Sequence, residues 1–467
     1  MQNIMLAVNH VLKVVIISLI CLVLFSCKKY LDAKPDSKLV IPTATSELIK
    51  LLDNNTYLNS LSSSAGDYCG ESFYYSDDIF DGLPEESKYG YTWNEKMFSL
   101  QRNAADWQAT YNVVYYSNVV LEKLNDIEKT TNNQDEWNYC KGAAFTFRAK
   151  AFHELAQIWA KAYDSSGAAS DMGIPLRLSS DFNLATTRAS MKDTYDRIIN
   201  DLQAAIPLLP VSQIHPFRPT KPAAYGMLAR TFLAMRAYDK AGLYADSCLQ
   251  LRNKLINYNN IDPSIDFPFQ HIVYDNPEDI LHSTLGGMTL DGWATLSHDA
   301  NVDTSFLKSY NDDDLRKVIF FKSRGDGSYY YNGMYGYSFG DGNLYNGITT
   351  AEMLLIKAEV LARQQRNAEA LTVLNTLLEH RWKTATFIPI ASNSWQATLD
   401  IILEERHKEL CFRGQRFSDI KRLNKEGREI ALTRTVKGQS YTLTPNDPRW
   451  ALPIPDLVIQ NTGIEQN

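Results

Sequence analysis

The sequence predicts a mainly α-helical protein in which tetratricopeptide-like helical hairpins form the scaffold and long irregular, aromatic-rich insertions interrupt it. Three observations support this fold class. Apolar residues recur at three- and four-residue spacing over long segments, two later segments share a spacing of small residues typical of helical repeats, and helical periodicity fades between residues 257 and 350. With 467 residues and 45% hydrophobic content, the chain can bury a large core.

The amino terminus predicts an export signal followed by a lipid anchor. Residues 14–25 are almost entirely aliphatic or aromatic, and Lys13 precedes them. This run is shorter than the roughly 20 residues that a bilayer-spanning helix needs, and its basic flank is typical of a secretory signal peptide. The residues before Cys27 resemble a bacterial lipobox, from which Phe25 departs. We therefore expect residues 1–26 to be removed and Cys27 to be acylated, with a secreted soluble protein as the alternative.

Three segments in the first half of the chain predict long amphipathic helices. They are residues 107–124, residues 137–163 and residues 191–209, the last of which ends at Pro210. In each, the apolar spacing places the large side chains on one helix face, so that face is expected to pack against the core. A proline after the last segment supports a helix end there, because proline has no backbone N–H to continue the hydrogen bonding.

Two later segments predict helical hairpins. In each, two alanines stand twelve residues apart, Ala229 with Ala241 and Ala358 with Ala370. Small residues at this interval, with a turn between them, allow two antiparallel helices to approach closely, as in tetratricopeptide repeats. The two segments lie 129 residues apart, so the sequence predicts a helical scaffold with long insertions and not a tandem solenoid.

Composition and motifs exclude several classes of protein. The net charge is −7, and removal of Lys13 with the signal peptide makes it −8, so nucleic acid is not an expected partner. No H-E-x-x-H zinc motif and no phosphate-binding glycine loop occurs, so we expect no metal and no cofactor. Four cysteines beyond the anchor have no C-x-x-C spacing, and either disulfides or buried thiols are compatible with them: Cys69, Cys140, Cys248 and Cys411.

Aromatic residues make up 11% of the chain, and many gather in segments that are not helical in pattern. A pyranose ring stacks its C–H faces on aromatic rings and binds its hydroxyl groups to a few fixed polar side chains. Such clusters therefore predict sugar contacts, although tyrosines in irregular segments or β-hairpins also simply cover a core. The candidate ligand-binding residues are Tyr74, Tyr75, Asp77, Asp78, Tyr91, Trp93 and Asn94 in a first cluster, Trp293 in a second, and Tyr330 and Tyr335 in a third.

The carboxy-terminal part carries the most specific motif. Residues 401–424 read "IILEERHKELCFRGQRFSDIKRLN", and "LPIP" follows near the end of the chain. Together they resemble the SusD/RagB family of outer-membrane nutrient-binding lipoproteins, whose motif has Glu where Arg413 stands and Leu where Ile420 stands. Further segments match the same family in order: residues 147–160, 173–176, 218–230 and 351–362.

The same motif has a structural interpretation. Arg406 with Glu409 and Arg416 with Asp419 stand at i,i+3, and Gly414 is placed to end a helix in the left-handed conformation. Glu405 and Glu409 share one helix face at i,i+4, which does not suit the acid and base of a glycosidase, since these must face each other across a cleft. We therefore expect an ion-paired helix end at this motif.

The resemblance implies a non-enzymatic protein, lipid-anchored at the outer membrane and facing the cell surface. Such a protein captures an oligosaccharide or a similar nutrient for a SusC-like TonB-dependent transporter, without a cofactor. It also implies a single domain over residues 27–467, with an amino-terminal helical part (27–217), a hairpin (218–256), a ligand-face insertion (257–350) and a carboxy-terminal helical part (351–467). The alternatives are a surface-anchored glycoside hydrolase and a repeat-type scaffold that binds only proteins.

Overall fold

The structure, a computed structural model, describes residues 42–70, 72–99, 104–212, 214–269, 276–286, 299–335 and 344–467. The predicted signal peptide, the anchor Cys27 and the candidate Trp293 lie outside the described residues. Residues Ala44–Asn467 form one compact unit.

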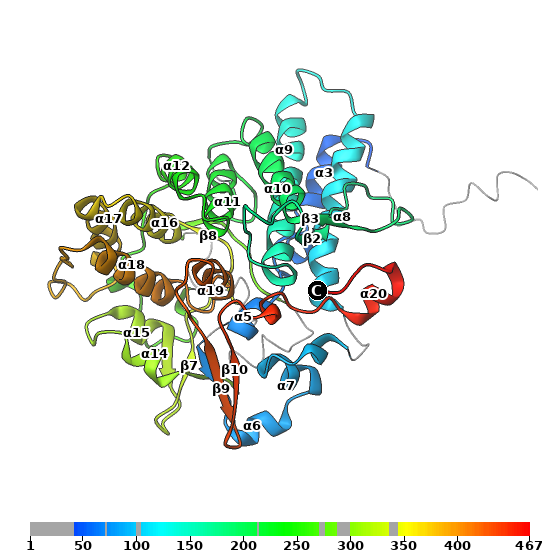
Figure 1. The fold of residues 1–467 in the computed structure, drawn as a ribbon. Coiled ribbons are helices and arrows are strands. Elements are labelled where there is room, and N and C mark those ends of the chain that lie inside the picture. The colour runs from blue at the N-terminus through cyan, green and yellow to red at the C-terminus, as the bar shows by residue number, and fades with distance from the viewer. Residues whose placement is uncertain are drawn as a thin grey trace, which may run out of the picture. The chain divides into compact units, whose positions relative to one another are not determined.

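Long helices form the scaffold, which confirms the predicted mainly α-helical fold class (Figure 1). Helix α8 covers the first predicted segment, whereas α9 and α10 end before the predicted ends. The end of α9 is fixed by Lys421, whose ammonium group donates 2.6 Å hydrogen bonds to the carbonyl oxygens of Gln157 and Ala160. The scaffold helices are α8 (Ala105–Lys123), α9 (Gln134–Trp159), α10 (Met191–Ala205), α11 (Lys221–Ala234), α12 (Tyr238–Leu249), α16 (Thr350–Arg363), α17 (Asn367–Glu379), α18 (Trp395–Glu409) and α19 (Arg416–Asn424).

Both predicted hairpins are present, as α11 with α12 and as α16 with α17. The four alanines that predicted them are completely buried, so the helices of each pair approach closely at these positions. Each turn contains one residue in the left-handed conformation, Arg236 in the first and Gln365 in the second, both at φ 61°. Helix α12 also packs against α16, so the two hairpins are neighbours in space although the insertion separates them in sequence.

Short elements carry the insertions. Each described strand pairs with one other in a two-stranded antiparallel sheet: β1 (Phe73–Tyr74) with β5 (Asn301–Val302), β2 (Met172–Pro175) with β3 (Arg188–Ser190), β4 (Asp279–Leu281) with β8 (Ile348–Thr349), β6 (Phe321–Ser323) with β7 (Tyr329–Tyr331), and β9 (Leu432–Val436) with β10 (Gln439–Leu443). The short helices are α3 (Thr45–Leu52), α4 (Asn55–Leu58), α5 (Ala65–Gly70), α6 (Asp77–Gly82), α7 (Glu85–Tyr91), α14 (Thr304–Lys308), α15 (Leu315–Phe320) and α20 (Asp456–Thr462), with 3₁₀ turns η1 (Glu95–Phe98), η2 (Leu124–Asp126), η3 (Tyr258–Asn260) and η6 (Pro448–Trp450).

Helices α18 and α19 confirm the expected ion-paired motif, but the predicted pair of Arg406 with Glu409 is wrong. The Nε of Arg406 donates to Asp419 at 2.8 Å, across the turn between the two helices, and not to Glu409 on its own helix. Glu409 instead accepts from Arg381 at 2.9 Å. Gly414 lies in the turn with φ 70°, as predicted for a left-handed residue at a helix end. Long arginine side chains reach partners on other elements, which spacing within one helix does not reveal.

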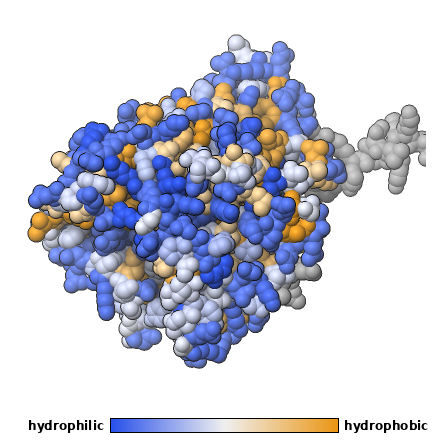
Figure 2. All heavy atoms as spheres, viewed as in Figure 1, coloured by the Kyte–Doolittle hydropathy of each residue, from blue (hydrophilic) through white to orange (hydrophobic). Residues whose placement is uncertain are grey.

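The sequence left open whether the four cysteines form disulfides or remain buried thiols. The four described cysteines are buried free thiols, so no disulfide joins them. Among the described residues, no helix combines the length and the apolar character needed to cross a bilayer. Figure 2 shows a largely hydrophilic face on which apolar side chains gather in separate small patches, one of them over α20.

Candidate functional site

Three members of the first predicted cluster lie in the core. The side chains of Tyr75, Tyr91 and Trp93 are 3%, 0% and 0% exposed. The guanidinium carbon of Arg434 from β9 lies 4.5 Å from the Tyr91 ring centre and 4.6 Å from that of Trp93, and Tyr75 packs on Tyr91 with ring centres 4.8 Å apart. Burial raises the pKa of Tyr75 well above its ordinary value. Tyr91 and Trp93 form a cation–π core with Arg434, Tyr75 packs beside them, and none of the three rings has a face free for a sugar, which corrects their prediction as ligand contacts.

Tyr335 from the third cluster is also a core residue. Its side chain is 1% exposed, and its ring lies 4.4 Å from that of Phe269 and 4.3 Å from the guanidinium carbon of Arg413. Arg413 is one of the two residues that depart from the family motif at residues 401–424, and here it is buried against aromatic rings. Tyr335 therefore supports the interior, and its prediction as a ligand contact is likewise corrected.

The polar members of the first cluster remain at the surface. Asp77 and Asp78 are exposed in the first turn of α6, and Asn94 is exposed before η1. Asp77 accepts a 2.8 Å hydrogen bond from the backbone N–H of Lys437, in the turn of the β9–β10 hairpin. Asn94 accepts one of 2.9 Å from the N–H of Lys96 and so caps η1. Asp77 and Asn94 therefore already accept hydrogen bonds that stabilise the fold, whereas no such bond occupies Asp78 among the described residues.

Two predicted tyrosines from distant segments meet on one surface. Tyr74 in β1 stands opposite Asn301 in β5, and Asn301 accepts a 3.0 Å hydrogen bond from the Nε of Arg324. The guanidinium carbon of Arg324 lies 5.0 Å from the ring centre of Tyr330 in β7. Arg324 is exposed and the other three side chains are half-buried. We call Tyr74, Asn301, Arg324 and Tyr330 the tyrosine platform; its aromatic, amide and guanidinium groups are the types that bind sugars.

Sequence reasoning missed two members of the tyrosine platform. Asn301 and Arg324 carry no motif, and a single asparagine or arginine in an irregular segment gives no signal on its own. Only the pairing of β1 with β5 and the hairpin of β6 with β7 bring them between Tyr74 and Tyr330.

A cavity of about 360 Å³ opens on the same β1–β5 pair, and we call it the β1 cavity. It is lined by Ser72, Asp303 and Phe306, with His407 from α18 and Arg434 from β9. The imidazole of His407 stacks on Phe306 at 4.2 Å, and burial together with the charge of Arg416 lowers the pKa of His407 well below its usual range. His407 is therefore neutral at physiological pH and can exchange hydrogen bonds with hydroxyl groups without adding charge.

Asp303, the carboxylate among the residues that line this cavity, and the two glutamates of the motif on α18 are all engaged in the fold. Asp303 accepts hydrogen bonds from the N–H groups of Ser305 and Phe306, at 2.8 and 2.9 Å, and caps α14. Glu405 and Glu409 lie in buried ion pairs with Arg316. No group of three or more His, Cys, Asp or Glu side chains among the described residues is arranged to hold a metal ion. The surface can thus present hydrogen-bonding groups and rings to a ligand, which is the chemistry of binding.

Two family models match the sequence. One, described as starch-binding and associating with the outer membrane, matches residues 29–233 and is SusD-like. The other, the SusD family, matches residues 322–467. No curated protein matches the sequence.

Solved structures share the fold. A SusD superfamily protein from Bacteroides thetaiotaomicron superposes with a TM-score of 0.73 at 20% identity, over 91% of this chain and 98% of that protein. A SusD-like carbohydrate-binding protein from Bacteroides vulgatus gives 0.68 at 21% identity, over 90% and 97%. A SusD superfamily protein from Bacteroides fragilis gives 0.70 at 19% identity, over 90% and 98%. The two family models and the motif at residues 401–424 show that the chain belongs to the SusD/RagB family, whose fold the solved structures share.

Proposed function

We propose that this protein is a lipid-anchored surface receptor that binds an oligosaccharide, or a similar nutrient, on the tyrosine platform and delivers it to a SusC-like TonB-dependent transporter. The observation that carries the proposal is the meeting of Tyr74, Asn301, Arg324 and Tyr330 on one surface of a family member. These residues come from the amino-terminal part and the middle insertion, where the resemblance implies the ligand face.

The tyrosine platform suits a sugar physically. The ring of Tyr330 is stacked by Arg324 on one side, and a half-buried tyrosine ring loses little freedom when a pyranose packs on it. Asn301 and Arg324 hold each other in place, so donors and acceptors for hydroxyl groups are already ordered before the ligand arrives. The β1 cavity, which Ser72 and the neutral His407 line, offers room for a second sugar unit of the oligosaccharide.

Replacing Tyr330 with alanine is expected to weaken glycan binding about fivefold, because one aromatic stacking contact contributes about 1 kcal/mol. The measurement is calorimetry on the soluble form that starts after Cys27, with the strongest ligand from an array of starch, mannan, β-glucan and pectin oligosaccharides. Tyr57→Ala is the matched control, since Tyr57 is 38% exposed on α4 and belongs to no candidate site. Equal affinities of the Tyr330 and Tyr57 variants would remove the tyrosine platform as the binding surface.

The non-enzymatic role has its own test. We expect incubation of the purified protein with the bound glycan to release no new reducing ends, because the carboxylates near the β1 cavity are held in caps and ion pairs. Accumulating reducing ends would favour the glycoside hydrolase. Absence of binding to every glycan on the array would favour a different nutrient or a protein-binding scaffold.

Replacing Cys27 with serine is expected to move the protein from the membrane fraction to the soluble periplasmic fraction, because the hydroxyl group cannot receive the thioether-linked lipid. Fractionation and metabolic labelling with a palmitate analogue measure this change, with Cys69→Ser as the control cysteine variant. Label that persists on the Cys27 variant, or is absent from the wild type, would contradict the anchor.

A further inference from the structure

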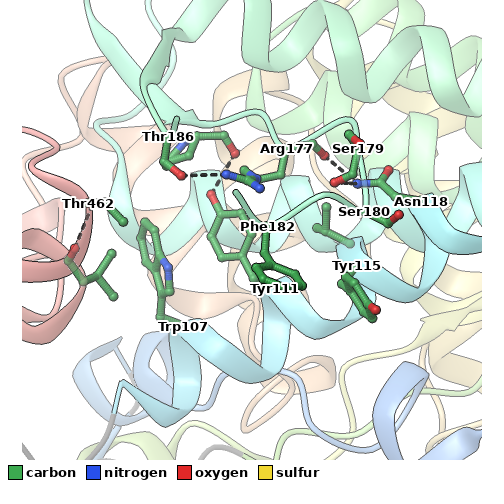
Figure 3. A pocket seen from close by; sticks show the side chains of 13 residues that line it. Trp107, Tyr111, Tyr115, Asn118, Arg177, Ser179, Ser180, Phe182, Thr186 and Thr462 are labelled. Atoms are coloured by element: carbon green, nitrogen blue, oxygen red, sulfur yellow. Dashed lines mark hydrogen bonds between the residues drawn. The ribbon is translucent and has the colours of Figure 1, made fainter. Parts of the chain in front are cut away.

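A second concave site lies far along the chain from the tyrosine platform, between α8, the loop after β2 and α20 (Figure 3). We call this site, of about 270 Å³, the α8 pocket. Helix α8 contributes Trp107, Tyr111 and Tyr115, and the loop contributes Arg177 and Phe182. Figure 3 shows that the rings of Tyr111, Tyr115 and Phe182 and the guanidinium group of Arg177 face the same space. No sequence motif pointed to this pocket.

The loop that covers the α8 pocket is held in one conformation. The Nη1 of Arg177 donates to the carbonyl oxygen of Leu184 at 2.7 Å and to the hydroxyl of Thr186 at 2.8 Å, and its Nη2 donates to the carbonyl oxygen of Asp181 at 2.6 Å. The amide of Asn118 donates to the carbonyl oxygen of Arg177 at 3.0 Å, which ties the loop to α8.

This ordered loop keeps a large apolar ring in water. The side chain of Phe182 is 82% exposed, and Tyr115 across the pocket is 44% exposed. The ordered loop and α8 hold these two rings in contact with water. This exposure is unfavourable for the isolated protein, because burying the apolar surface of each ring would lower the free energy. A ligand that binds between the two rings would bury their apolar surface, and the loop would not have to become ordered first.

The charge in the α8 pocket is not neutralised from within the protein. All three oxygens that accept hydrogen bonds from Arg177 are uncharged, and across the described part of the chain no carboxylate forms an ion pair with it. Glu122 nearby is occupied, since it accepts 2.7 and 2.9 Å hydrogen bonds from Ser179 and the N–H of Ser180. A guanidinium group that keeps unused N–H donors beside aromatic faces favours a ligand that carries a carboxylate.

We propose that the α8 pocket is a second sugar-binding site that takes a single acidic pyranose residue of the uronic-acid type. The ring stacks between Tyr115 and Phe182, and the carboxylate faces Arg177. The volume of about 270 Å³ is just below the usual range for ligand pockets, so the pocket fits one sugar ring and not an extended oligosaccharide. The choice of a sugar as the carrier of the carboxylate rests on the proposed function, whereas the ring and charge chemistry rests on the pocket alone.

The test uses the mature chain labelled with 5-fluorotryptophan, because Trp107 lies in the wall of the α8 pocket and reports on it locally. Its ¹⁹F signal is assigned as the one missing from Trp107→Phe. Three probes are titrated: methyl glucuronide, methyl glucoside, which has a neutral hydroxymethyl group in place of the carboxylate, and benzoate, which has the charge and a ring without a sugar. We expect a saturable shift with the glucuronide at about tenfold or greater higher affinity than with the glucoside, because a charge-assisted contact is lost in the neutral sugar.

Three variants separate the possible outcomes. Phe182→Ser should abolish the shift, while Ile388→Ser, at an equally 82% exposed position in the loop before α18, should leave it unchanged. Tyr330→Ala should also leave it unchanged, and loss of the shift in that variant would mean that the two sites are one. The proposal is overturned by no saturable shift, by equal affinity for the two glycosides, by a shift that survives Phe182→Ser, or by equal binding of benzoate. None of these results alters the array binding to the neutral glycans, starch, mannan and β-glucan, that tests the tyrosine platform.

Discussion

Replacing Arg381 with alanine is expected to lower the free energy of unfolding by about 3–5 kcal/mol, the range for removing one partner of a buried ion pair. The guanidinium group is completely buried and bridges two carboxylates, those of Glu278 and Glu409, at 2.8 and 2.9 Å. Its Nη1 also donates to the carbonyl oxygen of Ile256 at 2.9 Å. Without it, two like charges would face each other out of contact with water, which is the physical origin of the loss.

This arginine joins the ligand-face insertion to the carboxy-terminal helices. Glu278 precedes β4 in the insertion, and Glu409 ends α18. Urea unfolding followed by circular dichroism measures the effect, and Arg366→Ala provides the control, since Arg366 pairs with Glu369 at the surface and its loss should leave the midpoint unchanged. Similar midpoints for both variants would mean that the buried pair does not stabilise the fold.

Replacing Gly70 with alanine is expected to destabilise the protein by about 1–3 kcal/mol, the usual range for overpacking a core. A Cβ at this position would lie 2.9 Å from the Cα and the Cβ of Phe417 and 3.0 Å from its nitrogen. The neighbours are mainly backbone atoms, so helix α19 would have to move away from α5. The methyl group's gain in helix propensity, about 1 kcal/mol, offsets only part of this loss.

Gly82→Ala is the matched control for Gly70→Ala. Gly82 ends α6, and a Cβ there would meet no atom within 4 Å, so the same change should be neutral or slightly stabilising. Thermal unfolding of the two variants separates the steric effect from the general effect of removing a glycine. Because Gly70 lies just before β1, we also expect its variant to weaken binding at the tyrosine platform, which calorimetry with the array ligand measures.

Local pattern was sufficient for the scaffold. The alanine pairs predicted both hairpins and Gly414 was correctly predicted as left-handed, because these features depend on residues a few positions apart within one or two helices. The motif at residues 401–424 identified the family for a related reason: it lies in one continuous segment, so its residue spacing is visible in the sequence itself.

Burial within the aromatic clusters was decided by tertiary structure. Tyr74 is half-buried on the tyrosine platform while its neighbours Phe73 and Tyr75 are buried against Tyr91, because successive residues of an extended segment point to opposite faces. Composition predicted an aromatic ligand face but could not tell which rings faced outward.

The sequence by itself determined the helical scaffold, the family and the two regions from which the tyrosine platform is built. Only the tertiary structure decided which partners the arginines take, which rings remain exposed, and that α8, the loop after β2 and α20 enclose a pocket around Arg177. The physical reason is range: helix periodicity and turns arise between residues close in sequence, whereas burial and ion pairing depend on segments that meet only when the chain has folded.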